Sequence, residues 1–435
     1  MPHADLWNPQ YMYWLQFLER AGAWTRAHLE TYQLREIKRI VTHAYQNTAG
    51  YRALYDEAGV HPDDIRCAED LRAFPIVTRE MIRDNLKAFS ILRPGNTYTT
   101  TSGSTGVPFG FYRDPEAFSK ELASKAHQYH RIGWREGDRQ ISLRGAMIDT
   151  PDHTEFVAKF NELRLSVFHL TPKSLRTYYH KSIEYRPKWL RCYPSAGYIF
   201  ARWLKDTRRE FPQLKGVLCA SESLYDFQKD LLAEVFGCRV FSHYGQWELT
   251  VLAGFCEHED TYHVMPQYGY AELVDSNGQP VTEAGQTGEI IGTSFIMSAT
   301  PFVRYKTEDR TILAGWECPS CGRPYQVWER MEGRLQELII GKTGRRVSVT
   351  SIHFHDDTLD DVGQFQFHQT RKGQVTFRYV PRGPALCDEK QAKLLQCLQA
   401  KLDAGIEVEL QAVDRIPPGA RGKHHLLVQE IENAG

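Results

Sequence analysis

The 435-residue sequence lacks any apolar run that approaches the roughly 18 residues needed to span a membrane. Its first ten residues, MPHADLWNPQ, lack the basic and apolar regions of a signal peptide. The sequence also lacks a net charge of any size, because 53 lysines and arginines nearly cancel 54 aspartates and glutamates. Neither a nucleic acid nor a membrane is therefore predicted as the main partner. We expect a cytoplasmic protein that binds small molecules.

Cysteine is scarce, since the chain has nine, and their spacing is too irregular for a disulfide scaffold. Most are expected to be buried thiols. Cys318 and Cys321, in ECPSCGR, have the Cys-x-x-Cys spacing of half a structural zinc site. The segment GFCEHEDTYHV offers Cys256 with His258 or His263 as the other half. A redox pair and unpaired buried thiols are the alternatives.

The remaining composition is that of an ordinary globular chain, with 42% hydrophobic residues and material for two or three domains. Residues 7–88 have apolar groups at helical spacing, as in LREIKRIVTHAY. From about Arg139, short apolar runs such as QISLRG and GVLCAS alternate with amphipathic helical patterns, which predicts an α/β sheet. After GKTGRR we expect a small unit with strands GQFQFHQT and VTFRYV and a helix EKQAKLLQCLQAKL.

One segment, TYTTTSGSTGVPFGFYRD from Thr97 to Asp114, is rich in threonine, serine and glycine. Glycines let backbone N–H groups approach phosphate oxygens closely, and the hydroxyls add donors. The alternative is a solvated turn between two strands. The Gly-Lys-Ser/Thr ending of a P-loop is absent, so phosphate binding here would be of another type.

Further motifs follow this loop in a fixed order. They are SHYGQWE (Ser242–Glu248), RYKTEDR (Arg304–Arg310), EGRLQE (Glu332–Glu337) and ARGKHH near the C-terminus. With TSGSTGVP, the set resembles that of the adenylate-forming (acyl-AMP) ligases, in particular the phenylacetate-CoA ligase branch with its capsule-biosynthesis relatives. The resemblance extends from about Ala68 to Gln429, and the order of the motifs makes it more specific than any one of them.

The resemblance implies a set of nucleotide-binding residues. Tyr244 would pack on adenine, Asp309 would hold both ribose hydroxyls and Glu248 would help to hold magnesium, while Lys423 would be the catalytic lysine. The implied ATP-binding residues are Thr101, Ser102, Gly103, Ser104, Thr105, Gly106, Tyr244, Gly245, Asp309 and Arg334. Taken alone, each has a structural explanation, such as a core aromatic for Tyr244, a helix-start carboxylate for Glu248 and a solvated turn or loop for Asp309 and Lys423.

The sequence departs from the pattern of these ligases at several positions. Phe109 stands where a basic residue usually follows the loop proline, and Glu308 stands where a glycine precedes the ribose-binding aspartate. Gln336 and Glu337 occupy the hinge, which leaves the details of domain rotation open. Phe109 and Glu308 keep a non-catalytic, zinc-stabilised scaffold of the same fold as an alternative.

The resemblance also implies the architecture. We expect an α/β fold with a large N-terminal adenylating domain, residues 1–336, and a mobile, small α+β C-terminal domain, residues 337–435. Within the large domain, residues 1–90 would form a helical scaffold, residues 91–336 the α/β sheets and residues 256–321 a zinc subsite.

The implied reaction is ATP-dependent activation of a carboxylic acid as acyl-AMP, with release of pyrophosphate and then acyl transfer to coenzyme A. The acid and the acyl acceptor would be small molecules, and ATP, magnesium and zinc the cofactors. An amine or another acceptor in place of coenzyme A is the alternative, and a phosphotransferase that releases ADP is a rival. A homodimer is left open.

The acyl pocket is implied in the same way. It would be lined from RGAMID, YPSAG, ASESL and SHYGQ, and the candidate residues are Arg144, Tyr193, Ser221 and His243. Arg144 or His243 could steady a carboxylate. For zinc, the pattern of these relatives favours His263 over His258 as the partner of Cys256, so the expected set is Cys256, His263, Cys318 and Cys321.

Overall fold

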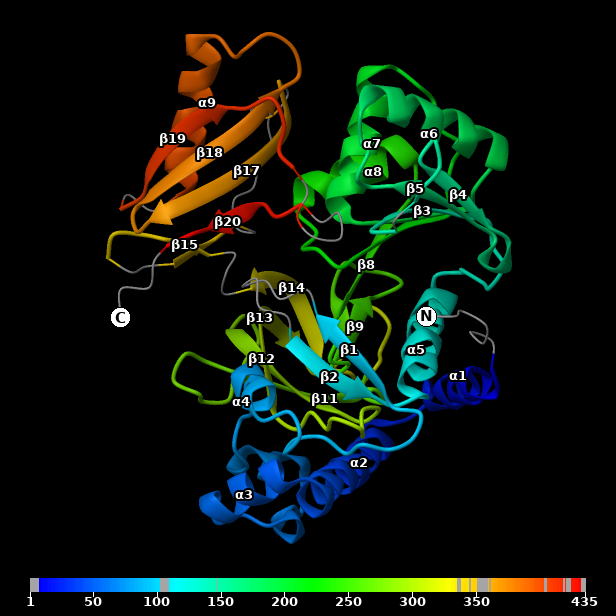
Figure 1. The fold of residues 1–435 in the computed structure, drawn as a ribbon, viewed down its shortest axis with the longest axis vertical. Coiled ribbons are helices and arrows are strands. Elements are labelled where there is room, and N and C mark those ends of the chain that lie inside the picture. The colour runs from blue at the N-terminus through cyan, green and yellow to red at the C-terminus, as the bar shows by residue number, and fades with distance from the viewer. Residues whose placement is uncertain are drawn as a thin grey trace. The chain divides into compact units, whose positions relative to one another are not determined.

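A computed structural model describes residues 8–101, 109–146, 148–334, 338–343, 346–349, 359, 361–402, 405–417, 419 and 424–431. The chain divides into two compact units, Met1–Glu136 with His243–Met331 and Gly137–Ser242 with Glu332–Gly435. Helices and strands alternate in the middle of the chain, and a small separate sheet forms near the C-terminus (Figure 1). The predicted α/β fold class, with its helical N-terminal region, is confirmed.

The first unit combines N-terminal helices with an antiparallel sheet. Its helices are α1 (Pro9–Ala21), α2 (Arg26–Asn47), α3 (Ala49–Ala58), η1 (Pro62–Asp64), η2 (Ala68–Ala73), α4 (Arg79–Asp84) and α5 (Ala117–Arg131). Its strands are β1 (Thr97–Thr101), β2 (Phe109–Arg113), the end of β8 (Val240–Gly245), β9 (Leu252–Phe255), β10 (Tyr262–Val264), β11 (Gly269–Val274), β12 (Thr287–Ser294), β13 (Tyr305–Gly315) and most of β14 (Val327–Arg334).

The helices of this unit begin where a side chain caps them. Asn8 accepts a hydrogen bond from the backbone N–H of Tyr11 at 2.9 Å, and Thr25 and Thr48 cap α2 and α3 in the same way. Such caps satisfy N–H groups that have no partner within the helix. The buried face of α2, which includes Ile37 and Val41, joins the largest core cluster of the unit.

The strands of the first unit are arranged in the order β11-β12-β13-β14-β10-β9-β8, while β1 and β2 form a two-stranded sheet of their own. Neighbouring strands β11 and β12, β12 and β13, β14 and β10, β10 and β9, and β9 and β8 run antiparallel. From the sequence, residues 269–313 are predicted to be mostly strands and turns, with DSNGQP and EAGQTGE as turn signals, and β11, β12 and β13 confirm the strands.

The second unit contains a mostly parallel sheet and the small C-terminal sheet. Its helices are η3 (Ala158–Phe160), α6 (Pro172–Tyr185), α7 (Pro194–Asp206), α8 (Asp226–Phe236) and α9 (Asp388–Lys401). Its strands are β3 (Gln140–Arg144), β4 (Thr154–Val157), β5 (Glu162–Ser166), β6 (Trp189–Cys192), β7 (Gly216–Ala220), the start of β8, β15 (Leu338–Ile340), β16 (Arg346–Ser348), β17 (Val362–Arg371), β18 (Gln374–Pro381), β19 (Glu407–Ala412) and β20 (Leu427–Gln429).

The parallel sheet follows from nearly continuous apolar strands. Strands β5, β3, β6 and β7 are parallel neighbours in that order, and all five residues of β7 are buried. Runs of this kind are typical of strands covered on both faces. The small sheet has the order β19-β18-β17-β20, and β17, β18 and α9 confirm the strands and helix predicted for this part of the chain.

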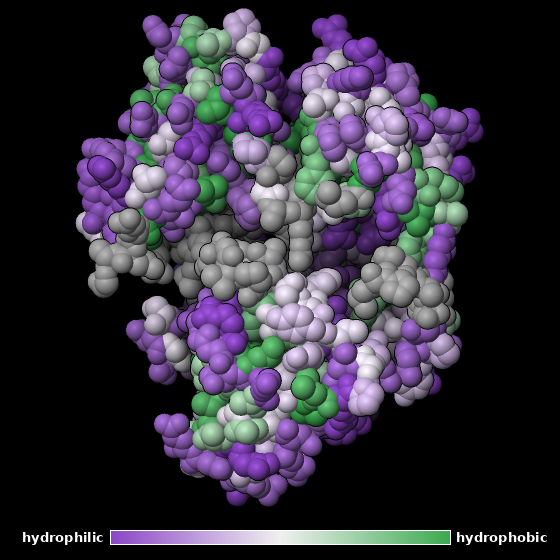
Figure 2. All heavy atoms as spheres, in the orientation of Figure 1, coloured by the Kyte–Doolittle hydropathy of each residue, from purple (hydrophilic) through white to green (hydrophobic). Residues whose placement is uncertain are grey.

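The surface is mixed in character. Figure 2 shows one face on which hydrophilic residues predominate and hydrophobic ones are scattered. The large hydrophobic side chains that are exposed come from separate parts of the chain and are Met12, Tyr13, Leu92, Tyr98, Phe156, Trp247 and Trp316. Among the described residues, none of the helices combines the length and apolar character that crossing a bilayer would require.

Candidate active site and metal centre

The hydroxyl-rich segment is carried by the hairpin of β1 and β2. The two strands are antiparallel, and Thr101 is paired with Phe109 at their far end. The connecting residues 102–108, with the predicted ATP-binding residues Ser102, Gly103, Ser104, Thr105 and Gly106, lie outside the described residues. A Cβ atom at Gly110 would lie 1.8 Å from the hydroxyl of Tyr98, so a larger residue there would require the exposed Tyr98 side chain to move. The hairpin therefore fixes both ends of the loop.

Phe109, where these ligases usually have a basic residue, points into the core. Phe109 and Phe111 are fully buried. Both rings pack against Phe302, and the ring of Phe109 is stacked on that of Tyr305 with centroids 6.3 Å apart. Burying an ammonium group in this place without a partner would cost about 5 kcal/mol. The aromatic residue instead anchors the hairpin.

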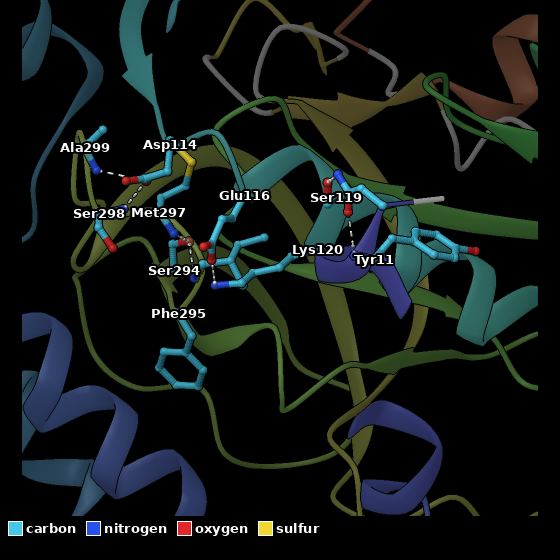
Figure 3. A network of polar contacts seen from close by, with 12 residues as sticks. Tyr11, Asp114, Glu116, Ser119, Lys120, Ser294, Phe295, Met297, Ser298 and Ala299 are labelled. Carbon is cyan, nitrogen blue, oxygen red and sulfur yellow. Dashed lines mark hydrogen bonds and ion pairs between the residues drawn. The ribbon is translucent and has the colours of Figure 1, made fainter. Parts of the chain in front are cut away.

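The base of the hairpin is fastened to the turn that follows β12. The carboxylate of Asp114 accepts the backbone N–H groups of Ser298 and Ala299 at 2.7 and 3.0 Å (Figure 3). In the same view the hydroxyl of Ser294 accepts the backbone N–H of Met297 at 3.1 Å. Charge-assisted bonds to the main chain are among the stronger protein hydrogen bonds, so this turn holds the hairpin firmly.

Tyr244 and Asp309, the residues assigned to adenine and ribose, lie together. The Tyr244 hydroxyl donates to the Asp309 carboxylate at 2.8 Å, and the Tyr244 ring packs edge-on against the buried Trp328 with centroids 5.7 Å apart. Gly245 ends β8 beside Tyr244 and is exposed. At Glu308 the main chain has φ +64°, a conformation that a glycine adopts freely. Glu308 thus places a side chain on a backbone conformation that favours glycine.

Glu248 is buried, with 4% of its surface exposed. The Tyr305 hydroxyl donates to its carboxylate at 3.0 Å, and burial raises the pKa of Tyr305 well above its usual value. Arg79, at the start of α4, lies 3.8 Å from Glu248 and 3.9 Å from Glu308. Sequence reasoning missed Arg79, because no local pattern links it to a glutamate so far along the chain.

The other nucleotide residues are only partly placed. Thr101 ends β1 and Arg334 ends β14. Their backbone belongs to these strands, but their side chains lie outside the described part of the chain. The hinge residues Gln336 and Glu337 and the predicted catalytic Lys423 also lie outside the described residues. The roles of these residues stay predictions.

Three of the predicted acyl-pocket residues follow the carboxyl ends of neighbouring parallel strands. Arg144 ends β3, Tyr193 follows β6 and Ser221 follows β7. Arg144 donates to the Ser221 hydroxyl at 2.9 Å, and its guanidinium carbon lies 5.8 Å from the centroid of the Tyr193 ring. Ligands of open α/β sheets bind at this edge. Ser221 has φ +72°, a strained conformation of the kind that gathers at functional sites.

Glu222, beside Ser221, was not singled out from the sequence although it belongs to the quoted ASESL. Its carboxylate accepts the backbone N–H of Ser195 at 3.1 Å and that of His424 at 3.0 Å. His424 directly follows the predicted catalytic lysine. Within the second unit, Glu222 therefore ties the pocket edge to this part of the C-terminal segment.

His243, the fourth predicted pocket residue, belongs to the first unit. It is 8% exposed and its Nδ1 atom is 2.8 Å from the hydroxyl of Tyr129. The two rings meet edge to face, with centroids 5.8 Å apart. Tyr129 thus fixes the orientation of the imidazole.

The predicted metal ligands form one cluster in the first unit. The ligand atoms of Cys256, His263, Cys318 and Cys321 all lie within 4.8 Å of one another. The Cys256 and Cys318 sulfurs are 3.8 Å apart, as are the Cys321 sulfur and His263 Nε2. His258 contributes its backbone N–H to the Cys256 sulfur at 3.4 Å and is not in the cluster.

The donor set suits a metal ion. Three thiols and one imidazole are a tetrahedral Cys₃His set, and Cys256 and Cys318 are fully buried. Burial lowers the pKa of His263 to about 4, and the charges of Arg131 and Arg323 act in the same direction. The His263 Nδ1 atom is buried and has no hydrogen-bond partner among the described residues. The four ligand atoms are therefore close enough to bind one metal ion after small side-chain movements.

The chain is similar in sequence to several curated proteins, although no family model matches it. The phenylacetate-coenzyme A ligase of Pseudomonas putida is 25% identical over 358 residues, 80% of each chain. The corresponding enzyme of Escherichia coli is 26% identical over 72% of each chain. Protein CapK of Staphylococcus aureus is 22% identical over 83% of this chain and 81% of CapK.

Solved structures share the fold. A 2-hydroxyisobutyryl-CoA ligase in its postadenylation state superposes with a TM-score of 0.75 at 18% identity, covering 94% of this chain and 91% of that one. A GH3.15 acyl acid amido synthetase superposes with a TM-score of 0.63 at 13% identity, covering 92% and 88%. The likeness spans both compact units.

Proposed function

Because the chain is a distant homologue of the phenylacetate-coenzyme A ligases and of CapK, within the adenylate-forming ligase superfamily, we propose that it converts a carboxylic acid to acyl-AMP and then to a coenzyme A thioester. The observation that supports this most directly is the hydrogen bond of 2.8 Å between Tyr244 and Asp309. It brings together two segments 65 residues apart whose roles in adenine and ribose binding were assigned separately.

In the first half-reaction, a carboxylate oxygen of the acid attacks the α-phosphorus of ATP. The bond between this phosphorus and the bridging oxygen breaks, and pyrophosphate leaves. The charge that grows on the phosphate oxygens has to be neutralised, because two anions meet. Backbone N–H groups and hydroxyls of residues 101–106 and the ammonium of Lys423 would serve this purpose. Magnesium held at Glu248 would supply further positive charge there.

The surroundings of Glu248 fit this role. A buried carboxylate needs partners that hold its oxygens in place. The hydroxyl of Tyr305, a donor that burial keeps protonated, bonds one oxygen of Glu248, and the guanidinium of Arg79 lies 3.8 Å from the same oxygen. In the second half-reaction, the sulfur of the acceptor thiol attacks the acyl carbon and the thiol proton passes to solvent. The bond from that carbon to the phosphate oxygen breaks, and AMP leaves.

The acid would bind at the edge formed by Arg144, Tyr193 and Ser221. Arg144 is held by Ser221 and lies beside the Tyr193 ring, so its charge is directed before a ligand arrives. A guanidinium presents paired donors that match a carboxylate. With His424 tied to Glu222 nearby in the same unit, the edge adjoins the segment that would carry the catalytic lysine.

The proposal is tested by a panel of carboxylic acids with labelled ATP. We expect AMP and pyrophosphate in equal amounts, and only when a suitable acid is present. ADP and free phosphate would instead support a phosphotransferase. A protein that binds no ATP would support the non-catalytic scaffold.

A second acceptor class is favoured by one observation. The fold also matches a GH3.15 acyl acid amido synthetase over 92% of this chain. The acyl group could therefore pass to an amine, with the nitrogen rather than sulfur attacking the acyl carbon. Offering coenzyme A and a set of amino acids to the same preformed acyl-AMP separates a thioester from an amide product.

We also propose that Cys256, His263, Cys318 and Cys321 hold a structural zinc ion. Four protein ligands leave no open position, which is the arrangement of structural rather than catalytic zinc sites. The ion would join the β9–β10 loop to the turn that follows β13, and it would supply no chemistry to the reaction. Elemental analysis of the purified protein tests this directly.

A further inference from the structure

Trp247 lies between Tyr244 and Glu248 in the chain, yet it contacts the hairpin of β1 and β2. Its indole N–H donates to the Thr99 hydroxyl at 2.9 Å, and its carbonyl oxygen accepts from Arg113 Nη2 at 2.9 Å. The guanidinium carbon of Arg113 lies 4.4 Å from the centroid of the indole ring. One residue therefore contacts both strands of the hairpin.

The contacts of Trp247 lie next to the part of the hairpin that is packed into the core. Residues opposite each other in an antiparallel pair share a face, and Thr99 is paired with Phe111 as Thr97 is with Arg113. Phe111 is fully buried in the core cluster of the first unit. Trp247 thus holds the same face of the hairpin, next to the buried phenylalanine and on the side away from the loop.

The stacking contact between Arg113 and Trp247 involves a buried guanidinium rather than an exposed one. Only 4% of Arg113 is exposed, and burial lowers its pKa. A desolvated guanidinium over the face of an indole is more strongly attracted than an exposed one. Trp247 itself is 42% exposed, so its other surface stays open to solvent.

We infer that Trp247 is a positioning residue that couples the hairpin of β1 and β2, whose strands flank the hydroxyl-rich loop, to the segment carrying Tyr244 and Glu248. The inference rests on the proposed function, in which the loop holds phosphates and Tyr244 holds adenine. A nucleotide bridges the two elements only if they keep a fixed separation. The bond to Thr99 and the stack on Arg113 provide that constraint before the nucleotide binds.

Two single variants test the indole–hydroxyl bond from both sides. Trp247→Phe keeps a ring over Arg113 but loses the N–H, and Thr99→Val removes the acceptor. Losing a neutral hydrogen bond of this kind changes an equilibrium constant by about 2- to 12-fold. Each variant is therefore expected to raise the Kd for magnesium-ATP by that factor. Because both remove the same bond, the double variant should be no weaker than the single ones.

Hydrogen exchange without nucleotide gives an independent readout. The amides of β1 and β2 should exchange faster in both variants, while those of β11 and β12 stay unchanged. Trp316→Phe is the matched control, because Trp316 is 43% exposed and its indole N–H also donates one hydrogen bond, to the Thr282 carbonyl at 3.3 Å. This variant should bind ATP like the wild type.

The outcomes separate the coupling from the proposed function. If the wild type binds ATP and Trp247→Phe binds it equally well, the coupling is wrong and the proposed function stands. Additive losses in the double variant would also overturn the coupling, since they would mean that the two side chains act independently. A wild type that binds no ATP would overturn both.

Discussion

At Glu308 an unusual backbone φ angle precedes Asp309, the residue assigned to the ribose. A non-glycine residue with φ near +64° is strained by roughly 1–2 kcal/mol. The strain persists because Asp309 is held on both sides, by its backbone N–H to the Thr307 hydroxyl at 3.2 Å and by its carboxylate to Tyr244. Asp309 is 7% exposed, so its carboxylate is fixed rather than free to turn.

The first prediction concerns this carboxylate. Asp309→Asn should raise the Kd for ATP by about 10- to 100-fold, because hydrogen bonds to a charged acceptor are worth about 1.5–3 kcal/mol. Isothermal titration measures it. Asp138→Asn is the control, since Asp138 is also largely buried and accepts from Lys188 and Trp189 at 2.8 and 3.1 Å. Equal ATP affinity in the Asp309 variant and the wild type would remove Asp309 from the nucleotide site.

Among the elements, the ends of the parallel strands matter most for the acid. Strands β3, β6 and β7 are parallel neighbours, so the residues at their carboxyl ends converge without any shared sequence motif. This explains why Arg144, Tyr193 and Ser221 meet although they come from three separate segments. Among these three side chains, the positively charged guanidinium of Arg144 is best able to select a carboxylate ligand.

The second prediction follows from that cation. Arg144→Met should lower kcat/KM for the preferred acid by about 10- to 100-fold, as expected for a lost charge-assisted bond, and leave the Kd for ATP unchanged. Initial rates of pyrophosphate release over a range of acid concentrations measure it. Arg164→Met is the control, because Arg164 lies on β5 of the same sheet and pairs with Glu155 and Glu162. Similar losses in both variants would show that the sheet, and not the pocket, was damaged.

The metal cluster connects two other elements. The β9–β10 loop supplies Cys256 and the turn after β13 supplies Cys318, whose carbonyl accepts the backbone N–H of Gly322 at 2.8 Å. A turn closed in this way sets the Cys-x-x-Cys geometry. The two loops are 62 residues apart at these cysteines, so an ion would constrain a long stretch of chain.

The third prediction tests the ion. Purified protein should contain about one zinc per chain, as a single tetrahedral site requires, and Cys318→Ser should lose most of it and unfold at a lower temperature. Mass spectrometry of the metal content and thermal unfolding provide the measurements. Cys219→Ser is the control, because Cys219 is equally buried but lies outside the cluster, so it should keep the zinc. A zinc-free wild type of normal stability would contradict the proposal.

For the whole molecule, most of what could be predicted from the sequence came from the order of its motifs. Alternating apolar runs predicted the strands of the α/β sheet, and Cys-x-x-Cys with Cys256 and His263 predicted the cluster. The contacts of Arg79 with Glu248 and of Trp247 with the hairpin were not predicted. They join side chains far apart in the sequence, and no local spacing reports such a contact. The boundary between the large and the C-terminal domain at residues 336 and 337 stays a prediction.

The last prediction concerns the two half-reactions and therefore the chain as a whole. If the segment with Lys423 approaches the α-phosphate only during adenylation, its charge stabilises that transition state and is absent from acyl transfer. Lys423→Ala should then slow adenylate formation by about 10²- to 10³-fold, the usual cost of one preorganised contact. Transfer from a chemically prepared acyl-AMP should keep nearly the wild-type rate.

Rapid-quench measurements time the two steps separately. Lys342→Ala is the control, because Lys342 is exposed in the same C-terminal part and pairs with Glu407 at 3.2 Å. It should change neither rate. Equal slowing of both steps by Lys423→Ala would mean that the substitution perturbs the fold of the C-terminal part. No slowing of either step would make Lys423 a solvated loop residue, and the positive charge at the α-phosphate would then have to come from another side chain.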